Sequence, residues 1–327
     1  MNDLVTAQEW FSLGTRVPYD PAAKKILKAG EATGAADVVQ VFERVDRGDG
    51  QDEAAVWTTF MPGYPDGSYG WAAVDQHLRS TKNVPKLFVE FVGQGDSDKP
   101  AKYPYGTMER ADLVEAMWQA DGIRSTFLVT FDYSSLAALE LLSRQLERCE
   151  KGADLDTAIT GVLMINGGLF ADAHSHPFMT TPLLGSPLGP PFTWIAQRSA
   201  FVLNQMLRTM ISKGYPVSPE ELREIGEAIC RRDGARFMSR AARFRHEHQT
   251  KYAQRWDLGR LFHALQDSVS FHIVGSEDDP FEPNQVIKAR ERLGDQGLDI
   301  RMVPGGHLTT LEHPEQLARI IEDVAPN

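Results

Sequence analysis

A carboxylate stands where the sequence changes from a strand-like to a helix-like pattern. Asp132 follows the apolar run Thr126–Phe131 and precedes a helical pattern that starts at Leu136. A sharp strand-to-helix turn with small residues two places either side of its centre is a nucleophile elbow, because the backbone there is strained and crowded. Thr130 and Ser134 are suitable flanks if Asp132 is the centre, whereas Ser134 at the centre would have larger ones. We therefore expect Asp132 to be a nucleophile that forms a covalent ester with an electrophilic carbon.

A histidine lies on a loop that suits general-base chemistry. His307 follows Gly305 and Gly306, shortly after the strand-like run Leu298–Val303 and before a helical pattern. The near-neutral pKa of an imidazole suits the activation of water. The chain order of nucleophile, acid and histidine also fits, so we expect His307 to be the base.

An acidic turn supplies a carboxylate that could orient this histidine. The turn follows the strand-like run Val269–Val274 and contains Glu277, Asp278 and Asp279. A carboxylate here would fix the tautomer of the histidine and stabilise the imidazolium. Counting forward from Gly275 favours Asp278, whereas the Asp-Pro dipeptide favours Asp279, and the spacing leaves both open.

A Pro-Gly turn provides the fourth part of the site. Pro62 and Gly63 follow the strand-like run Val56–Met61. The backbone N–H groups of Tyr64 at this turn and of Tyr133 after the nucleophile would point at a developing oxyanion. We expect Tyr64 and Tyr133 to form the oxyanion hole.

The elements that must position these residues alternate along the chain. Further strand-like runs are Val38–Phe42, Lys86–Val92 and Gly161–Ile165, and helical patterns cover Met108–Ala120, Ser135–Arg148, Asn284–Leu293 and Thr310–Val324. This alternation predicts an α/β fold with a mostly parallel, doubly wound sheet. In such sheets ligands bind beyond the carboxyl ends of the strands.

The alternation stops between about residues 170 and 263. A segment rich in proline and glycine, residues 182–191, is followed by long helical patterns. One of them has Ser218 as its N-cap, Pro219 at the first helical position and an acidic first turn. We interpret residues 170–263 as a helical cap inserted into a core of residues 1–169 and 264–327; an ordinary helical hairpin that covers no site is the alternative.

Composition and net charge limit the classes of partner that we expect for the chain. Its 327 residues are 42% hydrophobic and 24% charged, which is ordinary for a globular protein. The net charge of −11 disfavours a nucleic-acid surface and gives no reason to expect an anionic membrane as partner. No run approaches the roughly 20 apolar residues that span a bilayer, and the N-terminus has no signal-peptide pattern. We interpret Cys149 and Cys230 as two reduced thiols, with one disulfide as the alternative, and expect a cytoplasmic monomer or homodimer that acts on a small molecule.

Two further patterns are weaker evidence, one for a dinucleotide-binding loop and one for a metal site. The segment from Gly93 to Asp96 lacks the full spacing of a dinucleotide-binding loop. The pairs His174/His176 and His246/His248 lack a third ligand at a recognisable spacing. We expect neither a cofactor nor a metal.

Together these residues resemble the α/β-hydrolase superfamily, and most of all its branch of epoxide hydrolases, haloalkane dehalogenases and mesoderm-specific-transcript-like proteins. The resemblance rests on five segments: Pro62–Trp71, Gly93–Pro100, Phe131–Tyr133, Asn166–Phe170, and Gly305–His307 with Glu312–Glu315 behind it. It implies a hydrolase whose aspartyl ester is cleaved by water that the histidine activates.

The resemblance leaves the electrophile open. Haloalkane dehalogenases carry a Trp after the nucleophile, where this chain has Tyr133. Epoxide hydrolases protonate the opening ring with cap tyrosines, which here could be Tyr215 or Tyr252. We expect an epoxide-hydrolase-like enzyme; a haloalkane dehalogenase, an ester or lactone hydrolase, and an inactive binding protein on the same fold are the alternatives.

Overall fold

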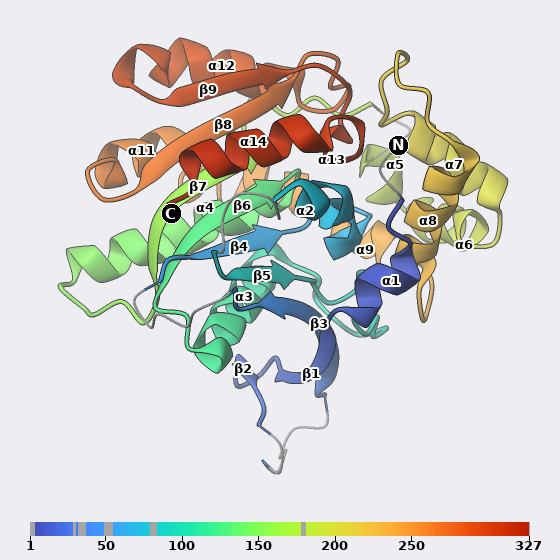
Figure 1. Ribbon diagram of the computed structural model, residues 1–327, viewed down its shortest axis with the longest axis horizontal. Helices are drawn as coiled ribbons and strands as arrows, with labels where there is room; N and C mark the ends of the chain where they lie inside the picture. The colour runs from blue at the N-terminus through green and yellow to red at the C-terminus, as the bar shows by residue number, and fades with distance from the viewer. Residues whose placement is uncertain are drawn as a thin grey trace.

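Nine strands form one sheet in the computed structural model, which describes residues 4–28, 31, 37–48, 55–78, 84–177 and 181–326. They are β1 (Thr15–Asp20), β2 (Lys25–Ile26), β3 (Val39–Asp46), β4 (Trp57–Met61), β5 (Lys86–Val89), β6 (Ser125–Phe131), β7 (Ala158–Ile165), β8 (Ser270–Ser276) and β9 (Asp299–Val303). The strand order is β2-β1-β3-β5-β4-β6-β7-β8-β9 (Figure 1). The first three pairs in this order are antiparallel, and the strands from β5 to β9 run parallel.

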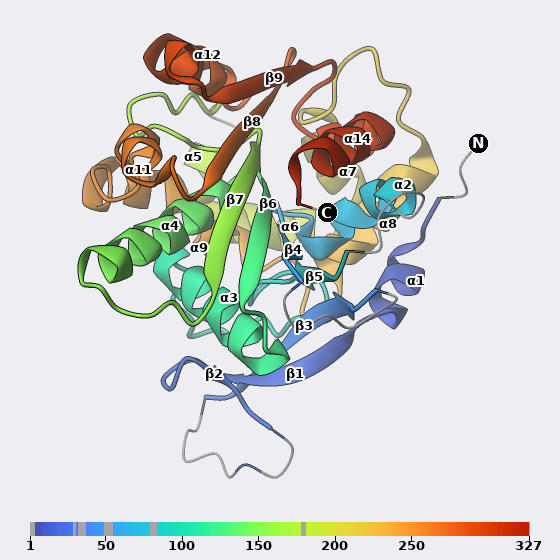
Figure 2. The ribbon, with the colours of Figure 1, turned by 60° about the vertical axis from the view of Figure 1, so that its left-hand side comes forward.

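Helices cover both faces of the sheet. α3 (Thr107–Asp121), α4 (Ser134–Glu150) and α11 (Leu258–Leu265) lie on one side, and α2 (Ala72–Leu78) and α14 (Pro314–Val324) lie on the other (Figure 2). A mostly parallel sheet between two helical layers is the α/β architecture that the sequence predicts.

Most of the predicted elements correspond to observed ones. The seven predicted strands are β3 to β9, and three of the four predicted helices are α3, α4 and α12 (Pro283–Leu293). The fourth helical pattern, Thr310–Val324, corresponds to two helices, because α13 (Thr309–Glu312) ends before Pro314 and α14 begins there. A residue that precedes proline is disfavoured in the helical region, and His313 accordingly has φ −135°.

β6 and α4 form the centre of the fold. All residues of β6 after the first are buried, as expected for a strand covered on both faces. The first half of α4 is buried as well. The turn that joins them is therefore held from both sides.

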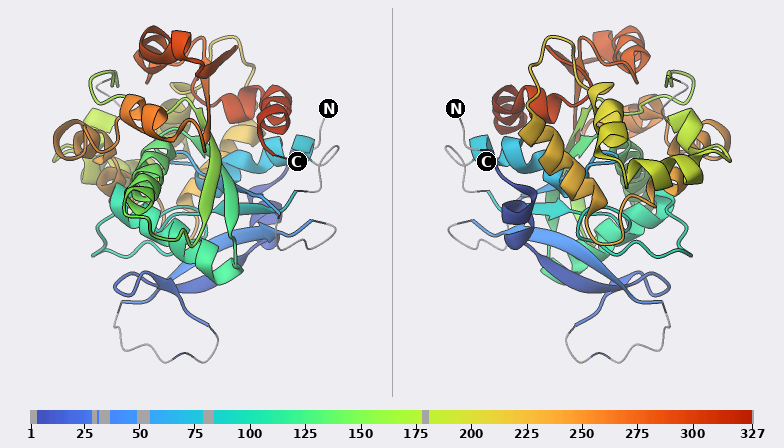
Figure 3. Two further views of the ribbon diagram at one scale, coloured as in Figure 1. Left: turned by 90° about the vertical axis from the view of Figure 1, so that its left-hand side faces the viewer. Right: turned by 90° about the vertical axis from the view of Figure 1, so that its right-hand side faces the viewer.

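Between β7 and β8 the regular elements of the described chain are helices. They are α5 (Thr181–Leu184), α6 (Gly189–Ala196), α7 (Ala200–Arg208), α8 (Pro219–Cys230), α9 (Met238–Ala241), α10 (Phe244–His246), the π-helical turn η2 (Glu247–Lys251) and α11. α8 begins as predicted, with Ser218 accepting a hydrogen bond from the Glu221 N–H and Pro219 in the first turn. The helices α6, α7 and α8 gather on one side of the molecule (Figure 3, right). α11, by contrast, packs beside α4 on the sheet, so the chain has returned to the sheet by Leu258.

The remaining elements are α1 (Ala7–Ser12), the turn η1 (Gly67–Trp71) and the turn η3 (Gly294–Gln296). Cys149 and Cys230 are free thiols, as predicted. In the described part of the chain, no helix is both long enough and apolar enough to cross a lipid bilayer.

Candidate active site

Asp132 lies in the turn between β6 and α4, just beyond the carboxyl end of β6. Asp132 has φ +53°, a left-handed conformation that is strained for a residue with a side chain. Its N–H donates to the Ile165 carbonyl at 2.9 Å, and its own carbonyl accepts from the Ser135 N–H at 3.1 Å. The loop after β7 comes so close that a Cβ on Gly167 would lie 1.9 Å from Ser135 Oγ. The elbow is thus fixed by its neighbours, and only Asp132 points from it into a pocket.

Ser134 closes this turn. Its hydroxyl accepts from the Phe131 N–H at 3.0 Å and lies 2.8 Å and 3.0 Å from the carbonyl oxygens of Phe131 and Met61. The side chain is fully buried. A hydroxyl engaged with the backbone in this way is not placed for attack on a substrate.

His307 lies between two carboxylates. Its Nε2 is 3.5 Å from Asp132 Oδ1, and its Nδ1 is 3.0 Å from Asp279 Oδ1. Burial opposes protonation of the imidazole, but the charges and hydrogen bonds of Asp279 and Asp132 outweigh it and raise the pKa of His307 well above its usual value. Of the two acids that the sequence left open, the structure places Asp279 against the ring. Asp278 is exposed, and its backbone N–H donates to the Gly305 carbonyl at 3.0 Å.

An asparagine ties the ends of two strands to the histidine loop. Asn166, at the end of β7, has φ +47°. Its Oδ1 accepts from the Ser276 N–H at 2.9 Å, and its Nδ2 lies 2.9 Å from the His307 carbonyl and 2.8 Å from Ser276 Oγ. Sequence reasoning missed this role, because the partners are more than a hundred residues away. The positive φ, which asparagine tolerates better than most residues, is the local reason for this residue type.

The loop after β4 brings a backbone N–H to the nucleophile. The Tyr64 N–H donates to Asp132 Oδ2 at 3.1 Å. Gly63 is needed beside it, since a Cβ there would lie 2.3 Å from the Phe131 ring. Tyr133 stands at the N-terminus of α4, where backbone N–H groups lack partners within the helix. The side-chain rings of Tyr64 and Tyr133 meet edge to face, with centroids 5.8 Å apart.

The buried Glu90 hydrogen-bonds to the loop that follows β4. Glu90 accepts from the Ser68 N–H at 3.0 Å and from the Ser68 hydroxyl at 2.6 Å. It also accepts from the Asp96 N–H at 2.5 Å, so it joins the loop after β4 to the loop after β5. Burial is the largest influence on Glu90 and raises its pKa. Nothing in the local sequence pattern singles this residue out.

Asp132 and His307 line one small pocket. Residues from the segment between β7 and β8 form much of its wall: His176, Thr181, Leu184, Met206, Met238 and Phe244. Apolar walls with few polar groups are typical of small-molecule sites. The described residues of this segment that line the pocket and carry exchangeable protons on their side chains are His176, Thr181 and Thr209, and the Thr209 hydroxyl donates to the Met206 carbonyl at 2.6 Å.

Neither predicted cap tyrosine lines this pocket. The Tyr215 hydroxyl donates to Glu221 Oε1 at 2.6 Å, and its ring borders a separate cavity. The Tyr252 ring packs on Trp256 with centroids 4.3 Å apart. Helical patterns in the sequence could not show which way these side chains point.

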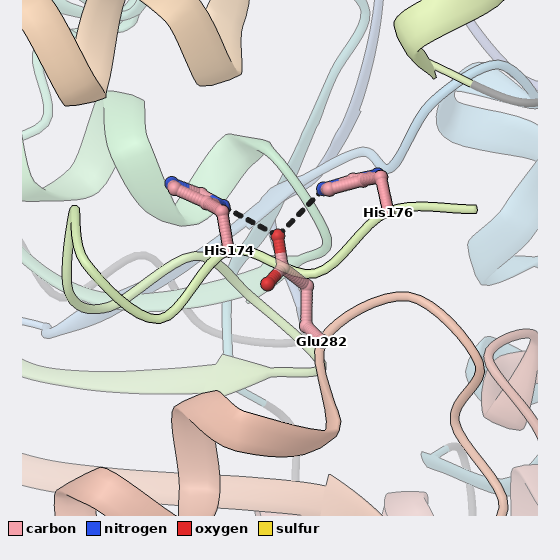
Figure 4. A group of neighbouring side chains, drawn as sticks. All are labelled: His174, His176 and Glu282. Atoms are coloured by element: carbon pink, nitrogen blue, oxygen red, sulfur yellow. Dashed lines mark hydrogen bonds and ion pairs between the residues drawn. The ribbon is translucent and has the colours of Figure 1, made fainter. Parts of the chain in front are cut away.

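A cluster of two histidines and a glutamate borders the pocket. His174 Nδ1 and His176 Nε2 lie 2.6 Å and 2.7 Å from the same oxygen of Glu282 (Figure 4). Burial opposes ionisation of this carboxyl, but the hydrogen bonds from the two rings outweigh it and lower the pKa of Glu282 to about 2. The sequence shows no third group for this histidine pair because Glu282 is more than a hundred residues away. Among the described residues these three could also hold a metal ion.

Comparisons with known proteins find relatives among hydrolases. The family model for the α/β-hydrolase family matches residues 60–320. A putative hydrolase, LipZ of Mycobacterium tuberculosis, is 26% identical over 260 residues, which cover 79% of this chain and 84% of that protein. The mesoderm-specific transcript homolog protein of Homo sapiens is 27% identical over 227 residues, covering 68% of this chain and 64% of that protein.

Solved structures share the fold. The haloalkane dehalogenase DatA from Agrobacterium tumefaciens superposes with a TM-score of 0.63 at 19% identity, covering 95% of each chain. A thermophilic esterase from Thermogutta terrifontis gives 0.63 at 16% identity, covering 94% of this chain and 97% of the esterase. At these identities the likeness concerns the fold alone.

Proposed function

The chain belongs to the α/β-hydrolase family, and we propose that it hydrolyses small epoxides through an ester formed on Asp132. The observation that carries the proposal is the placement of the two carboxylate oxygens. Oδ2 accepts from the Tyr64 N–H, and Oδ1 faces His307. Ser134, the alternative nucleophile, is occupied by the backbone of its own turn.

In the first half-reaction Oδ1 of Asp132 attacks an epoxide carbon, the carbon–oxygen bond of the ring breaks, and the released ring oxygen takes up one proton to become a hydroxyl. The product is an ester whose carbonyl oxygen is Oδ2. This oxygen already lies 3.1 Å from the Tyr64 N–H. One donor of the proposed oxyanion hole would therefore already be in position when the charge develops, and a preorganised donor lowers the barrier.

In the second half-reaction His307 activates water. While Asp132 is ionised, it helps to keep His307 protonated. Ester formation removes that charge, so the pKa of the imidazole falls and the ring releases its proton to solvent. The neutral ring can then accept a proton from water. Asp279 keeps the ring oriented through its hydrogen bond to Nδ1. Collapse of the tetrahedral intermediate releases the diol and restores the carboxylate.

Trapping the ester tests this proposal. His307→Gln removes the base and should allow the ester to accumulate, because alkylation does not need His307 to take a proton from water. Hexene oxide should add its mass to the His307→Gln protein and to Asp132 in particular, located by peptide mass mapping. The double variant with Asp132→Asn is the control and should remain unmodified.

Other outcomes would identify the alternatives. An adduct with hexyl bromide but not with hexene oxide would indicate a dehalogenase. Turnover of aryl esters that survives Asp132→Asn but not Ser134→Ala would indicate an ester hydrolase. No adduct and no turnover with epoxides, haloalkanes or lactones would favour a binding protein.

A further inference from the structure

We propose that His174, His176 and Glu282 bind one divalent transition-metal ion, and we assign zinc. This inference goes beyond the proposed function, because it concerns a second group of side chains whose ligand can be measured without any substrate. It also departs from the expectation that the chain holds no metal. That expectation arose because Glu282 is more than a hundred residues away from the histidine pair in the sequence.

The three side chains direct their ligand atoms to one point (Figure 4). His174 Nδ1 and His176 Nε2 lie 2.6 Å and 2.7 Å from Oε1 of Glu282. The ligand atoms of the three residues all lie within 4.8 Å of one another. Two imidazoles and one glutamate form a ligand set that zinc accepts, with a fourth position left for water. The residue types and their convergence therefore suit one zinc ion.

The cluster is almost completely shielded from solvent. The side chain of His174 is 0% exposed, and those of His176 and Glu282 are each 2% exposed. The rings of Phe244 and Phe281 flank His176, with centroids 6.0 Å and 5.7 Å away. In such surroundings water weakens the attraction between a carboxylate and a cation only little. A cation between these ligands also neutralises a buried carboxylate, which is costly to leave without a partner.

The far nitrogen of each ring also has a partner. His174 Nε2 lies 2.8 Å from His248 Nδ1, and His176 Nδ1 lies 2.9 Å from Thr181 Oγ1. When an ion occupies the near nitrogens, each ring must carry its proton on the far one. His248 Nδ1 and Thr181 Oγ1 can each accept that proton in a hydrogen bond. Histidines that bind metals usually have such an outer partner, which fixes the tautomer and the orientation of the ring.

The carboxylate ligand is held in the same way. Oε2 of Glu282 accepts from Gln285 Nε2 at 3.1 Å. Gln285 is itself fixed, because its Oε1 accepts from the N–H groups of Leu169 and Phe170 at 3.0 Å and 2.8 Å. The second oxygen of Glu282, Oε1, is thereby left for an ion. All three proposed ligands thus have the outer support that is typical of metal sites.

An ion here replaces the ring protons that face Glu282. Zinc holds nitrogen and oxygen ligands at about 2.0–2.1 Å, so neighbouring ligand atoms of a tetrahedral site lie about 3.4 Å apart. The contacts of 2.6 Å and 2.7 Å to Glu282 must therefore lengthen by roughly 0.7–0.8 Å. Without an ion the same groups form ordinary hydrogen bonds, in which each ring donates to the carboxylate. The two states differ in metal content, which is the quantity to measure.

The site joins two segments that flank the candidate catalytic residues. His174 and His176 follow β7, and Glu282 lies after Asp279 in the loop between β8 and α12. Asp279 Oδ1 lies 3.0 Å from His307 Nδ1. An ion that holds Glu282 therefore also holds the loop that contacts His307. We expect zinc to stabilise the folded chain by joining these segments.

Zinc binding by the full chain without a polyhistidine tag tests the site. Protein that is treated with a chelator and dialysed against zinc should retain about one zinc per chain in elemental analysis. Thr181→Val removes an outer partner and should weaken the affinity by about 10–100-fold. Glu282→Gln and His174→Gln each remove a ligand, so they should weaken it by more than this range.

The matched control is a histidine that contacts a single carboxylate elsewhere. His272 Nδ1 lies 2.8 Å from Asp299 Oδ2, which reproduces one contact of the cluster without its second ring. His272→Gln should bind zinc as the wild type does. Zinc should also raise the urea midpoint of the wild type and of His272→Gln, but not that of Glu282→Gln, because an ion that binds the folded chain stabilises it.

Cobalt in place of zinc reports the ligand types. The cobalt protein should show the visible bands of a site with few ligands, without the near-ultraviolet band of a thiolate. Cys149 and Cys230 are free thiols, so a thiolate band would place the ion at a cysteine and overturn the inference. X-ray absorption of the zinc protein should find only nitrogen and oxygen ligands, at about 2.0–2.1 Å.

Two further results would overturn the inference. One is a wild type that retains no more zinc than a protein-free dialysis control, which is decisive even where a variant fails to fold. The other is wild-type affinity in both Glu282→Gln and His174→Gln. These measurements use no epoxide, so they are independent of the proposed function. A chain that binds zinc but is not alkylated on Asp132 keeps the site and loses the proposed function, and the opposite result removes only the site.

Discussion

His307 Nε2 lies 3.5 Å from Asp132 Oδ1, while its Nδ1 lies 3.0 Å from Asp279 Oδ1. The buried imidazole thus has a carboxylate on each side, and their charges exceed the cost of its burial. One carboxylate is the expected nucleophile, which loses its charge when it is alkylated. The protonation of His307 is therefore coupled to the progress of the reaction.

Asp132→Asn should lower the pKa of His307, because it removes one of the two charges that raise it. Titration of the ring by NMR would measure the change. Asp278→Asn, which changes an exposed carboxylate of the same loop as Asp279, is the control and should leave the titration unchanged. An equal pKa in the wild type and in Asp132→Asn would contradict the coupling.

The raised pKa of His307 also makes the unfolding free energy of the protein depend on pH. Because folding raises the pKa of His307, the stabilisation from its protonation is fully present below about pH 6.5 and is lost as the pH rises through the folded pKa. The unfolding free energy of the wild type should therefore fall more steeply over this range than that of Asp132→Asn. Urea denaturation at a series of pH values would show the difference.

Asp279→Asn should reduce turnover by roughly a thousandfold or more, because an amide can hold the wrong tautomer of His307. Alkylation of Asp132 should be affected less than hydrolysis of the ester, so the intermediate should accumulate. Rapid-quench intact-mass measurements would show this. Asp278→Asn is again the matched control, and a comparable loss in that variant would count against Asp279 as the orienting acid.

Asn166→Ala should destabilise the fold by about 2–3 kcal/mol, because the Ser276 N–H and the His307 carbonyl would lose their buried partner. Urea unfolding would measure it. Asn284→Ala changes an exposed asparagine and should cost no more than about 0.5 kcal/mol. Similar values for the two variants would show that Asn166 does not hold the strand ends together.

Glu282→Gln should make the unfolding free energy depend less on pH in the acidic range. Folding lowers the pKa of Glu282 to about 2, so its stabilisation is present above the unfolded value of about 4.3 and is lost as the pH falls toward 2. The variant lacks this contribution at neutral pH. Its unfolding free energy should therefore change less than that of the wild type between these pH values, and an unchanged slope would argue against an ionised Glu282.

The sequence predicted the centre of the fold better than the N-terminal side of the sheet, where β1 and β2 lie. β4, β6 and β7 are apolar because helices cover both sides, so their pattern is continuous and easy to detect. β1 was not predicted, because Thr15–Asp20 contains Arg16 and Pro18 and its strand character depends on pairing with β3. A strand of this kind is defined by its partners β2 and β3, which a local pattern cannot show.

The candidate site likewise contains residues that the sequence could single out and contacts that only the folded chain reveals. Asp132 and His307 could be singled out because each stands in a local signature of strand, turn and helix. The contacts of Asp279 rather than Asp278 depend on the shape of one turn, which spacing does not determine. The contact between His176 and Glu282 joins residues 106 positions apart, and only the folded chain brings them together.

Single turnover in heavy-oxygen water tests the central claim, that Asp132 is the nucleophile. With enzyme in excess over hexene oxide, water attacks the ester carbonyl, so the heavy oxygen should enter the Asp132 carboxylate in the first turnover. Mass mapping of the peptide that contains Asp132 should find the label there and the diol unlabelled. Label in the diol alone, with an unlabelled Asp132 peptide, would contradict the account.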